Sequence, residues 1–172
     1  MWNCCTKCFR HCAASLPLGY ASDPFSRPFI DRLELAGQAA GIAIDPFMLN
    51  GPSEVDGALE AIEKARAEAV IAQGTFSTRQ LADLALKHRL ALVTIFRSFT
   101  EAGALMSYGY ERAALYRHLA LFVQRVLQGN KPADLPVEQP TKFELVINLK
   151  TAKALGIEIP PTLLARADEV IE

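Results

Sequence analysis

Apolar residues along the chain alternate between helical and extended spacing. From 25 to 41 they recur every three or four positions, which predicts a helix capped by Gly41. The same spacing predicts a second helix from Ser53, where Asp56 completes a capping-box pattern, and a third that ends near 88. Two more are predicted, over 110–128 and after the proline pair at 160–161.

Short apolar runs between these segments predict strands. The runs are 18–21, 42–49, 69–72, 91–96, 104–106 and 143–149. Pro46 cannot donate a ladder hydrogen bond, so 42–49 is expected at a sheet edge. Strands that alternate with helices through short links favour an α/β fold with a mostly parallel sheet flanked by helices.

Composition and charge narrow the classes of function. Of the 172 residues, 51% are hydrophobic and 22% charged, which is typical of a globular protein. The net charge is -1 with no basic stripe, so nucleic acid is not an expected partner. The sequence shows no apolar run long enough to span a bilayer and no signal peptide. As written, the chain would remain in the cytoplasm.

Four cysteines fall within the first twelve residues: Cys4, Cys5, Cys8 and Cys12. Together with His11 they raise the question of a zinc site. The spacing matches no common zinc finger, however, and two of the cysteines are adjacent. We therefore predict no metal and no other cofactor.

A candidate ligand site follows from the sheet. Ligands of open parallel sheets bind outside the carboxyl ends of the strands. The predicted loops there carry small polar groups, a guanidinium and aromatic rings, which suit a small polar or zwitterionic molecule. The candidate ligand-binding residues are Ser22, Asp23, Gln73, Gly74, Thr75, Phe96, Arg97, Ser107 and Tyr108.

Two of these residues have an alternative, structural interpretation. Arg97 is suited to a ligand carboxylate, but it also stands four residues before Glu101 and can pair with it. Tyr108 either stacks on a ligand or packs where the chain leaves the sheet.

Enzyme motifs are missing from the sequence. It has no nucleophile elbow, no phosphate-binding loop, no dinucleotide fingerprint and no paired-histidine metal motif. We therefore expect a binding module and no catalytic residue. An enzyme on a nucleotide-binding scaffold and a ligand-sensing regulatory domain are the alternatives.

Three segments carry a family resemblance: K-P-A-D-L-P-V-E-Q-P-T-K-F-E-L-V-I-N-L-K at 131–150 with its continuation to the C-terminus, A-D-L-A-L-K-H-R-L at 82–90, and E-A-G-A-L-M-S-Y-G at 101–109. Over 18–172 the chain resembles ABC-transporter substrate-binding proteins, a family that includes tryptophan- and tyrosine-binding members.

The resemblance implies a type I periplasmic-binding-protein architecture, in which two α/β lobes close on a small solute, often amino-acid-like. It also implies an ABC permease as partner and a periplasmic location. By this resemblance, 18–107 forms the second lobe and 108–172 returns into a first lobe that is largely missing. The helix 110–128, left without that lobe, is expected to drive self-association through its apolar face.

Residues 1–17 depart from the family. When Met1 to Ala14 is back-translated with GC-rich codons, another frame encodes E-L-L-H-E-V-L-P-P-L-R-R-I-A, which resembles a helix that precedes the second lobe in family members. We infer that this N-terminal lead, residues 1–17, is translated out of frame and that its cysteines have no function. The chain is then a truncated binding protein or a non-functional gene fragment, and the gene sequence decides between the frames.

Overall fold

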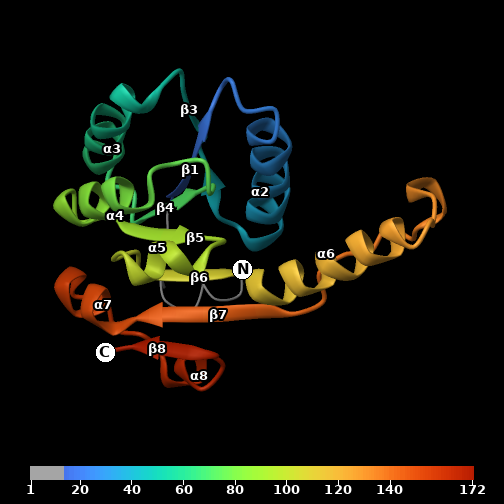
Figure 1. Ribbon diagram of the computed structural model, residues 1–172. Helices are drawn as coiled ribbons and strands as arrows, with labels where there is room; N and C mark the ends of the chain where they lie inside the picture. The colour runs from blue at the N-terminus through green and yellow to red at the C-terminus, as the bar shows by residue number, and fades with distance from the viewer. Residues whose placement is uncertain (1–13) are drawn as a thin grey trace.

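The computed structural model describes residues 14–172, and these build one eight-stranded sheet (Figure 1). The strands are β1 (Ala14–Tyr20), β2 (Ala43–Ile44), β3 (Phe47–Leu49), β4 (Ala69–Ala72), β5 (Ala91–Thr94), β6 (Met106–Tyr110), β7 (Phe143–Asn148) and β8 (Glu169–Ile171). Their order is β2-β1-β4-β5-β6-β7-β8, with β3 also paired to β1. All pairs are parallel except β6 with β7.

Helices cover both faces of this sheet, which confirms the predicted α/β class. They are α2 (Ser26–Ala40), α3 (Val55–Lys64), α4 (Thr78–Lys87), α5 (Arg97–Glu101), α6 (Arg112–Leu127), α7 (Leu149–Leu155) and α8 (Pro161–Leu164). Figure 1 shows α3 and α4 on one side of β1 and β4, and α2 on the other. Gly41 ends α2 in the left-handed conformation, as its position predicted.

The core explains why the central strands are apolar throughout. Val70 and Ala72 of β4 face α3 and α4, where Leu59 and Leu81 meet them. Their neighbours on β4 belong to a second cluster that includes Leu33 of α2. Successive residues of a strand point to opposite faces, so a strand covered on both sides has no position for a polar residue.

Local differences from the prediction have identifiable causes. The capping box at Ser53 is wrong, because a 3-10 turn over Pro52–Glu54 precedes α3. The Glu54 carboxylate accepts from the backbone N–H of Asn50 at 2.8 Å and thus closes that turn. The strand expected at 104–106 lies instead at 106–110, and the five-residue helix α5 before it was not predicted. A helix of five residues is too short to show helical periodicity in the sequence.

The sheet also crosses the domain boundaries expected from the sequence. The boundary at 17/18 falls inside β1, and the one at 107/108 falls inside β6. From 143 onward, β7 and β8 extend the same sheet. In the described structure this part therefore stays with the lobe, whereas the sequence led us to expect that it returns into a first lobe. The four cysteines of the predicted out-of-frame lead lie outside the described residues.

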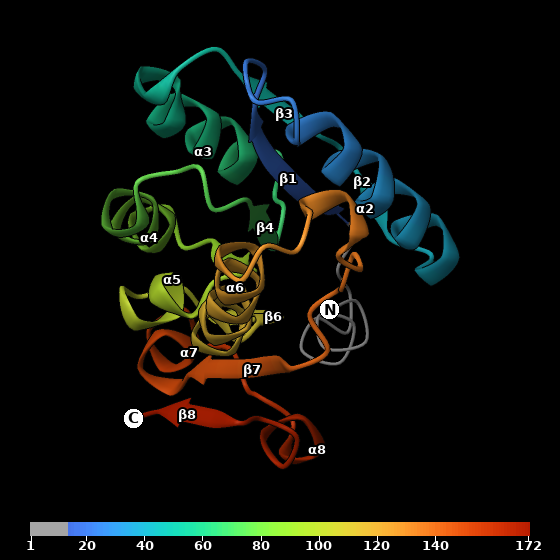
Figure 2. The ribbon, with the colours of Figure 1, turned by 45° about the vertical axis from the view of Figure 1, so that its right-hand side comes forward.

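Residues 111–142, here called the arm, leave the sheet. The arm consists of α6, a 3-10 turn over Pro132–Asp134 and extended chain, and both ribbon views show α6 projecting from the lobe (Figures 1 and 2). No residue of α6 is buried, and Leu127 is 83% exposed. The apolar face of α6 is therefore open, as expected for 110–128. Within 14–172, no helix combines the length and apolarity needed to cross a membrane.

Candidate functional site

The carboxyl ends of the parallel strands β1, β4 and β5 meet at one edge of the sheet. After β1 the chain turns through Ser22, which is exposed, and Asp23. The Asp23 carboxylate accepts from the backbone N–H of Phe25 at 2.9 Å, which fixes the turn before α2. Phe25 itself is 75% exposed at this edge, and sequence reasoning missed it.

Gln73, at the end of β4, is engaged inside the protein. Its side-chain carbonyl accepts from the Ser26 hydroxyl at 2.9 Å, and its amide donates to the carbonyl of Phe25 at 3.1 Å. The residue is 7% exposed. These two bonds fix the start of α2 against β4, so Gln73 supports the edge, and its direct contact with a ligand stays a prediction.

Gly74 and Thr75 follow Gln73 and are exposed. A Cβ atom on Gly74 would lie 1.9 Å from Cε2 of Phe96, so the ring occupies the space that any side chain would need. The glycine was predicted to let a ligand approach the backbone. Its role in the described structure is to accommodate the half-buried Phe96, which leaves the exposed backbone of Gly74 beside an aromatic ring.

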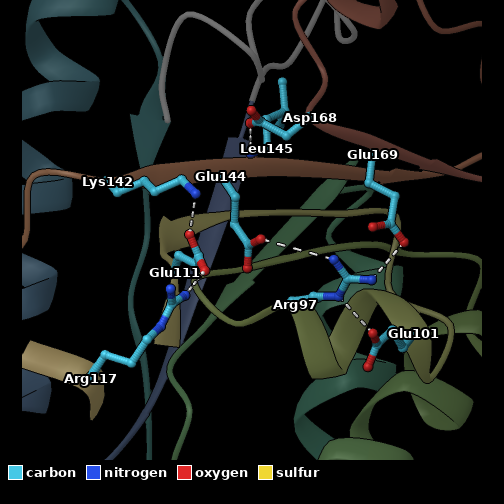
Figure 3. A network of polar contacts seen from close by, with 9 residues as sticks. All are labelled: Arg97, Glu101, Glu111, Arg117, Lys142, Glu144, Leu145, Asp168 and Glu169. Carbon is cyan, nitrogen blue, oxygen red and sulfur yellow. Dashed lines mark hydrogen bonds and ion pairs between the residues drawn. The ribbon is translucent and has the colours of Figure 1, made fainter. Parts of the chain in front are cut away.

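Arg97 is held by carboxylates of its own chain (Figure 3). Its Nε donates to Glu101 at 2.7 Å and its Nη2 to Glu169 at 2.6 Å, while Glu144 lies 4.0 Å from Nη1. Glu101 first, and then Glu169, raise the pKa of Arg97. The structural interpretation is therefore confirmed: Arg97 links α5 to β8. Burial raises the pKa of Glu144, and the nearby Arg97 opposes that shift.

Ser107 and Tyr108 lie inside β6 and not in a loop, because the strand continues to Tyr110. Ser107 is 1% exposed, and its hydroxyl has no hydrogen-bond partner among the described residues. The Tyr108 ring stacks on Phe143 of β7 with centroids 5.8 Å apart. The expected loop position of both residues is therefore wrong: they belong to the sheet, and their ligand role stays a prediction.

The base of the arm forms a second set of ion pairs. Glu111 accepts from Arg117 of α6 at 3.0 Å and from Lys142, where the chain returns to the sheet (Figure 3). The backbone N–H of Glu111 also donates to the carbonyl of Lys142 at 3.1 Å. Lys142 lowers the pKa of Glu111, so the carboxylate stays charged and joins the two ends of the arm.

The carboxyl edge of the sheet combines exposed and half-buried polar groups with aromatic surface. Ser22, Asp23 and Thr75 offer hydroxyls and a carboxylate, while Phe25 and Phe96 offer rings. Such a set holds a small molecule by hydrogen bonds at one end and by apolar contact at the other. Within residues 14–172, no cluster of histidine, cysteine and acidic residues is arranged to hold a metal ion.

An open, mostly parallel sheet with polar groups at its carboxyl edge defines the class of α/β ligand-binding lobes. The family model for ABC transporter substrate binding protein matches residues 19–171. The chain therefore belongs to this family. A search of curated proteins found no match.

Solved structures share the fold. A conserved domain protein from Vibrio cholerae aligns with a TM-score of 0.91 at 21% identity, over 98% of this chain and 58% of its own. An ABC domain from Streptococcus pneumoniae, in complex with L-Trp, aligns with a TM-score of 0.88 at 21% identity, over 98% of this chain and 60% of its own. A ligand-free, open substrate binding protein from Clostridium difficile aligns with a TM-score of 0.69 at 17% identity, over 96% of this chain and 58% of its own. This chain thus spans less than two thirds of each of these relatives.

Proposed function

We propose that this chain provides one wall of a solute-binding cleft that serves an ABC importer, and that it binds its ligand without chemical change. The observation that carries the proposal is the set of solvent-accessible groups at the carboxyl edge: Ser22, Thr75 and Phe25 are exposed there, and Asp23 and Phe96 are half-buried. Buried contacts such as those of Gln73 hold the edge in shape before a ligand arrives.

The ligand that best suits this edge is an amino acid with an apolar or aromatic side chain. Asp23 is an acceptor for an ammonium group, and the rings of Phe25 and Phe96 provide apolar contact. The L-Trp bound to the Streptococcus pneumoniae protein supports this choice of ligand class.

We further propose that the open face of α6 packs against a second lobe in a longer form of this protein. The relatives align with nearly all of this chain, arm included, yet continue well beyond it. Leu119, Val123 and Leu127 are exposed on α6, and burying such residues is favourable. Without a second lobe, the same face associates with another copy of the chain. Membership of the family supports a periplasmic location and an ABC permease as partner.

Titration calorimetry with L-tryptophan and L-alanine tests the binding proposal. A single wall loses the contacts of a closed cleft, so we expect a dissociation constant of about 0.1–1 mM for L-tryptophan and weaker binding of L-alanine. Asp23→Ala should weaken binding about tenfold, the effect of one charge-assisted hydrogen bond, whereas Asp45→Ala, at an exposed aspartate remote in sequence, should not. Equal affinity in both variants, or no heat with either amino acid, argues against this site.

Sedimentation velocity tests the face of α6. Leu119→Glu should shift any dimer toward monomer, because it places a charge on the apolar face. Gln124→Glu adds the same charge to the same helix at an exposed polar position and should leave the distribution unchanged. A wild-type chain that is monomeric at all concentrations contradicts self-association.

A further inference from the structure

The ring of Phe96 links the candidate edge to the arm. One edge of the ring fills the space beside Gly74. The ring also meets Tyr110 at the end of β6 in an edge-to-face contact, with centroids 5.8 Å apart. Over it, 5.6 Å from its centroid, lies the guanidinium of Arg112, the first residue of α6. Phe96 is therefore in contact with both the proposed site and the arm.

Arg112 is itself fixed by the arm. Its Nη2 donates to the Tyr116 hydroxyl one turn along α6 at 3.0 Å, and its guanidinium lies 5.7 Å from the centroid of that ring. The preceding residue, Glu111, joins the start of α6 to Lys142. The position of the cation over Phe96 is thus tied to the orientation of α6, since its partner Tyr116 lies on the same helix and the preceding residue, Glu111, is held by Lys142.

We propose that Arg112 is a positioning residue of the solute site: it keeps the Phe96 ring beside Gly74 and so makes the shape of the edge depend on the orientation of α6. The inference rests on the proposed function for its consequence in binding, but the contact between Arg112 and Phe96 can be tested without a ligand. A phenylalanine side chain turns about two bonds, so a contact on its open face selects one orientation among several.

Fluorine NMR of the full chain labelled with 4-fluorophenylalanine measures the position of the ring directly. The Phe96 signal is assigned by its loss in Phe96→Leu. Arg112→Met, which keeps the length of the side chain but removes the cation, should move or broaden the Phe96 signal. Arg112→Lys should restore part of the wild-type shift because it keeps the charge.

Arg125→Met is the matched control. Arg125 lies on the same helix and contacts a different ring, with its guanidinium 5.8 Å from the centroid of Phe122. This variant should move the Phe122 signal and leave the Phe96 signal in place. If Arg125→Met moves the Phe96 signal as much as Arg112→Met does, or if Arg112→Met leaves it unchanged, the proposal is wrong.

Titration with L-tryptophan then measures the consequence for the site. Arg112→Met should weaken binding about twofold to fivefold, the range expected for one exposed cation–π contact, and Arg125→Met should not. Unchanged affinity in Arg112→Met overturns the positioning role even when the ring has moved. If the wild-type chain fails to bind L-tryptophan, the proposed ligand is wrong, and the fluorine signal alone decides whether Arg112 positions Phe96.

Discussion

His88 joins α4 to α3 through both of its ring nitrogens. Nδ1 lies 2.7 Å from Glu63 and Nε2 lies 3.1 Å from Asp56, and the residue is 8% exposed. Carboxylates only accept hydrogen bonds, so both nitrogens must carry hydrogen and the ring is an imidazolium. Lys87, the neighbour of His88, opposes this charge, but Glu63 first and Asp56 second raise the pKa of His88.

Stability should therefore fall with rising pH because of this residue. The pKa of His88 is higher in the folded chain than its unfolded value of about 6.5, so its contribution is complete below about pH 6.5 and is lost as pH rises through the folded pKa. Hydrogen bonds to charged groups contribute about 1.5–3 kcal/mol. Because the Asp56 and Glu63 side chains are about half exposed, we expect screening to reduce the contribution of His88 to about 1–2 kcal/mol.

Urea unfolding of the wild type and of His88→Gln at pH 6 and pH 9 measures this contribution. At pH 6 the variant should be less stable, by about 1–2 kcal/mol beyond its deficit at pH 9, a midpoint difference of roughly 0.5–1 M for a typical urea slope. Taking the difference between the two proteins removes the other titrating groups that they share. A stability gap that is the same at both pH values refutes the imidazolium bridge.

Other predictions concern stability and can be measured by the same urea unfolding. Leu59→Ala, which empties a fully buried position between α3 and the sheet, should cost about 2–5 kcal/mol. Asn148→Ala should cost about 2 kcal/mol, because its buried side chain caps α7 by accepting from the N–H of Thr151 and donates to the carbonyl of Thr100. Gly57→Ala, in α3 with open space beside it, should stabilise by about 0.5–1 kcal/mol, whereas Gly156→Ala, at φ 72°, should destabilise by about 1 kcal/mol.

The sequence predicts the layers of this fold well because the layers depend on local pattern. The run at 69–72 is buried at every position, as its uniform apolar character predicted. The stripe of Val55, Leu59 and Ile62 is likewise buried. What the pattern cannot show is pairing over distance, such as β7 against β6. The sequence of a single strand does not indicate which strand it pairs with or in which direction. The return of 143–172 to the same sheet is therefore visible only in the structure.

The candidate site is predicted less completely, for a similar reason. Residue type shows that Gln73 and Arg97 can bind a ligand, but the hydrogen bond that holds Gln73 and the ion pair that holds Arg97 depend on Ser26 and Glu169, which lie far away in the sequence. The exposed residues Ser22, Gly74 and Thr75 and the half-buried Asp23 lie where strand ends predicted them. Arg112 was overlooked because α5 and β6 separate it from Phe96 in the sequence, and no periodicity reveals a contact over that distance.

The antiparallel pairing of β6 with β7 makes the arm an insertion with adjacent ends. Tyr110 and Phe143 are direct partners across the two strands, so the chain leaves and re-enters the sheet at neighbouring positions. Replacing 111–142 with a tight Asn-Gly turn would convert β6 and β7 into a β-hairpin without breaking the strand order. The lobe and the arm are thus separable by design, and an arm-free chain would present the carboxyl edge on a surface without the exposed apolar helix.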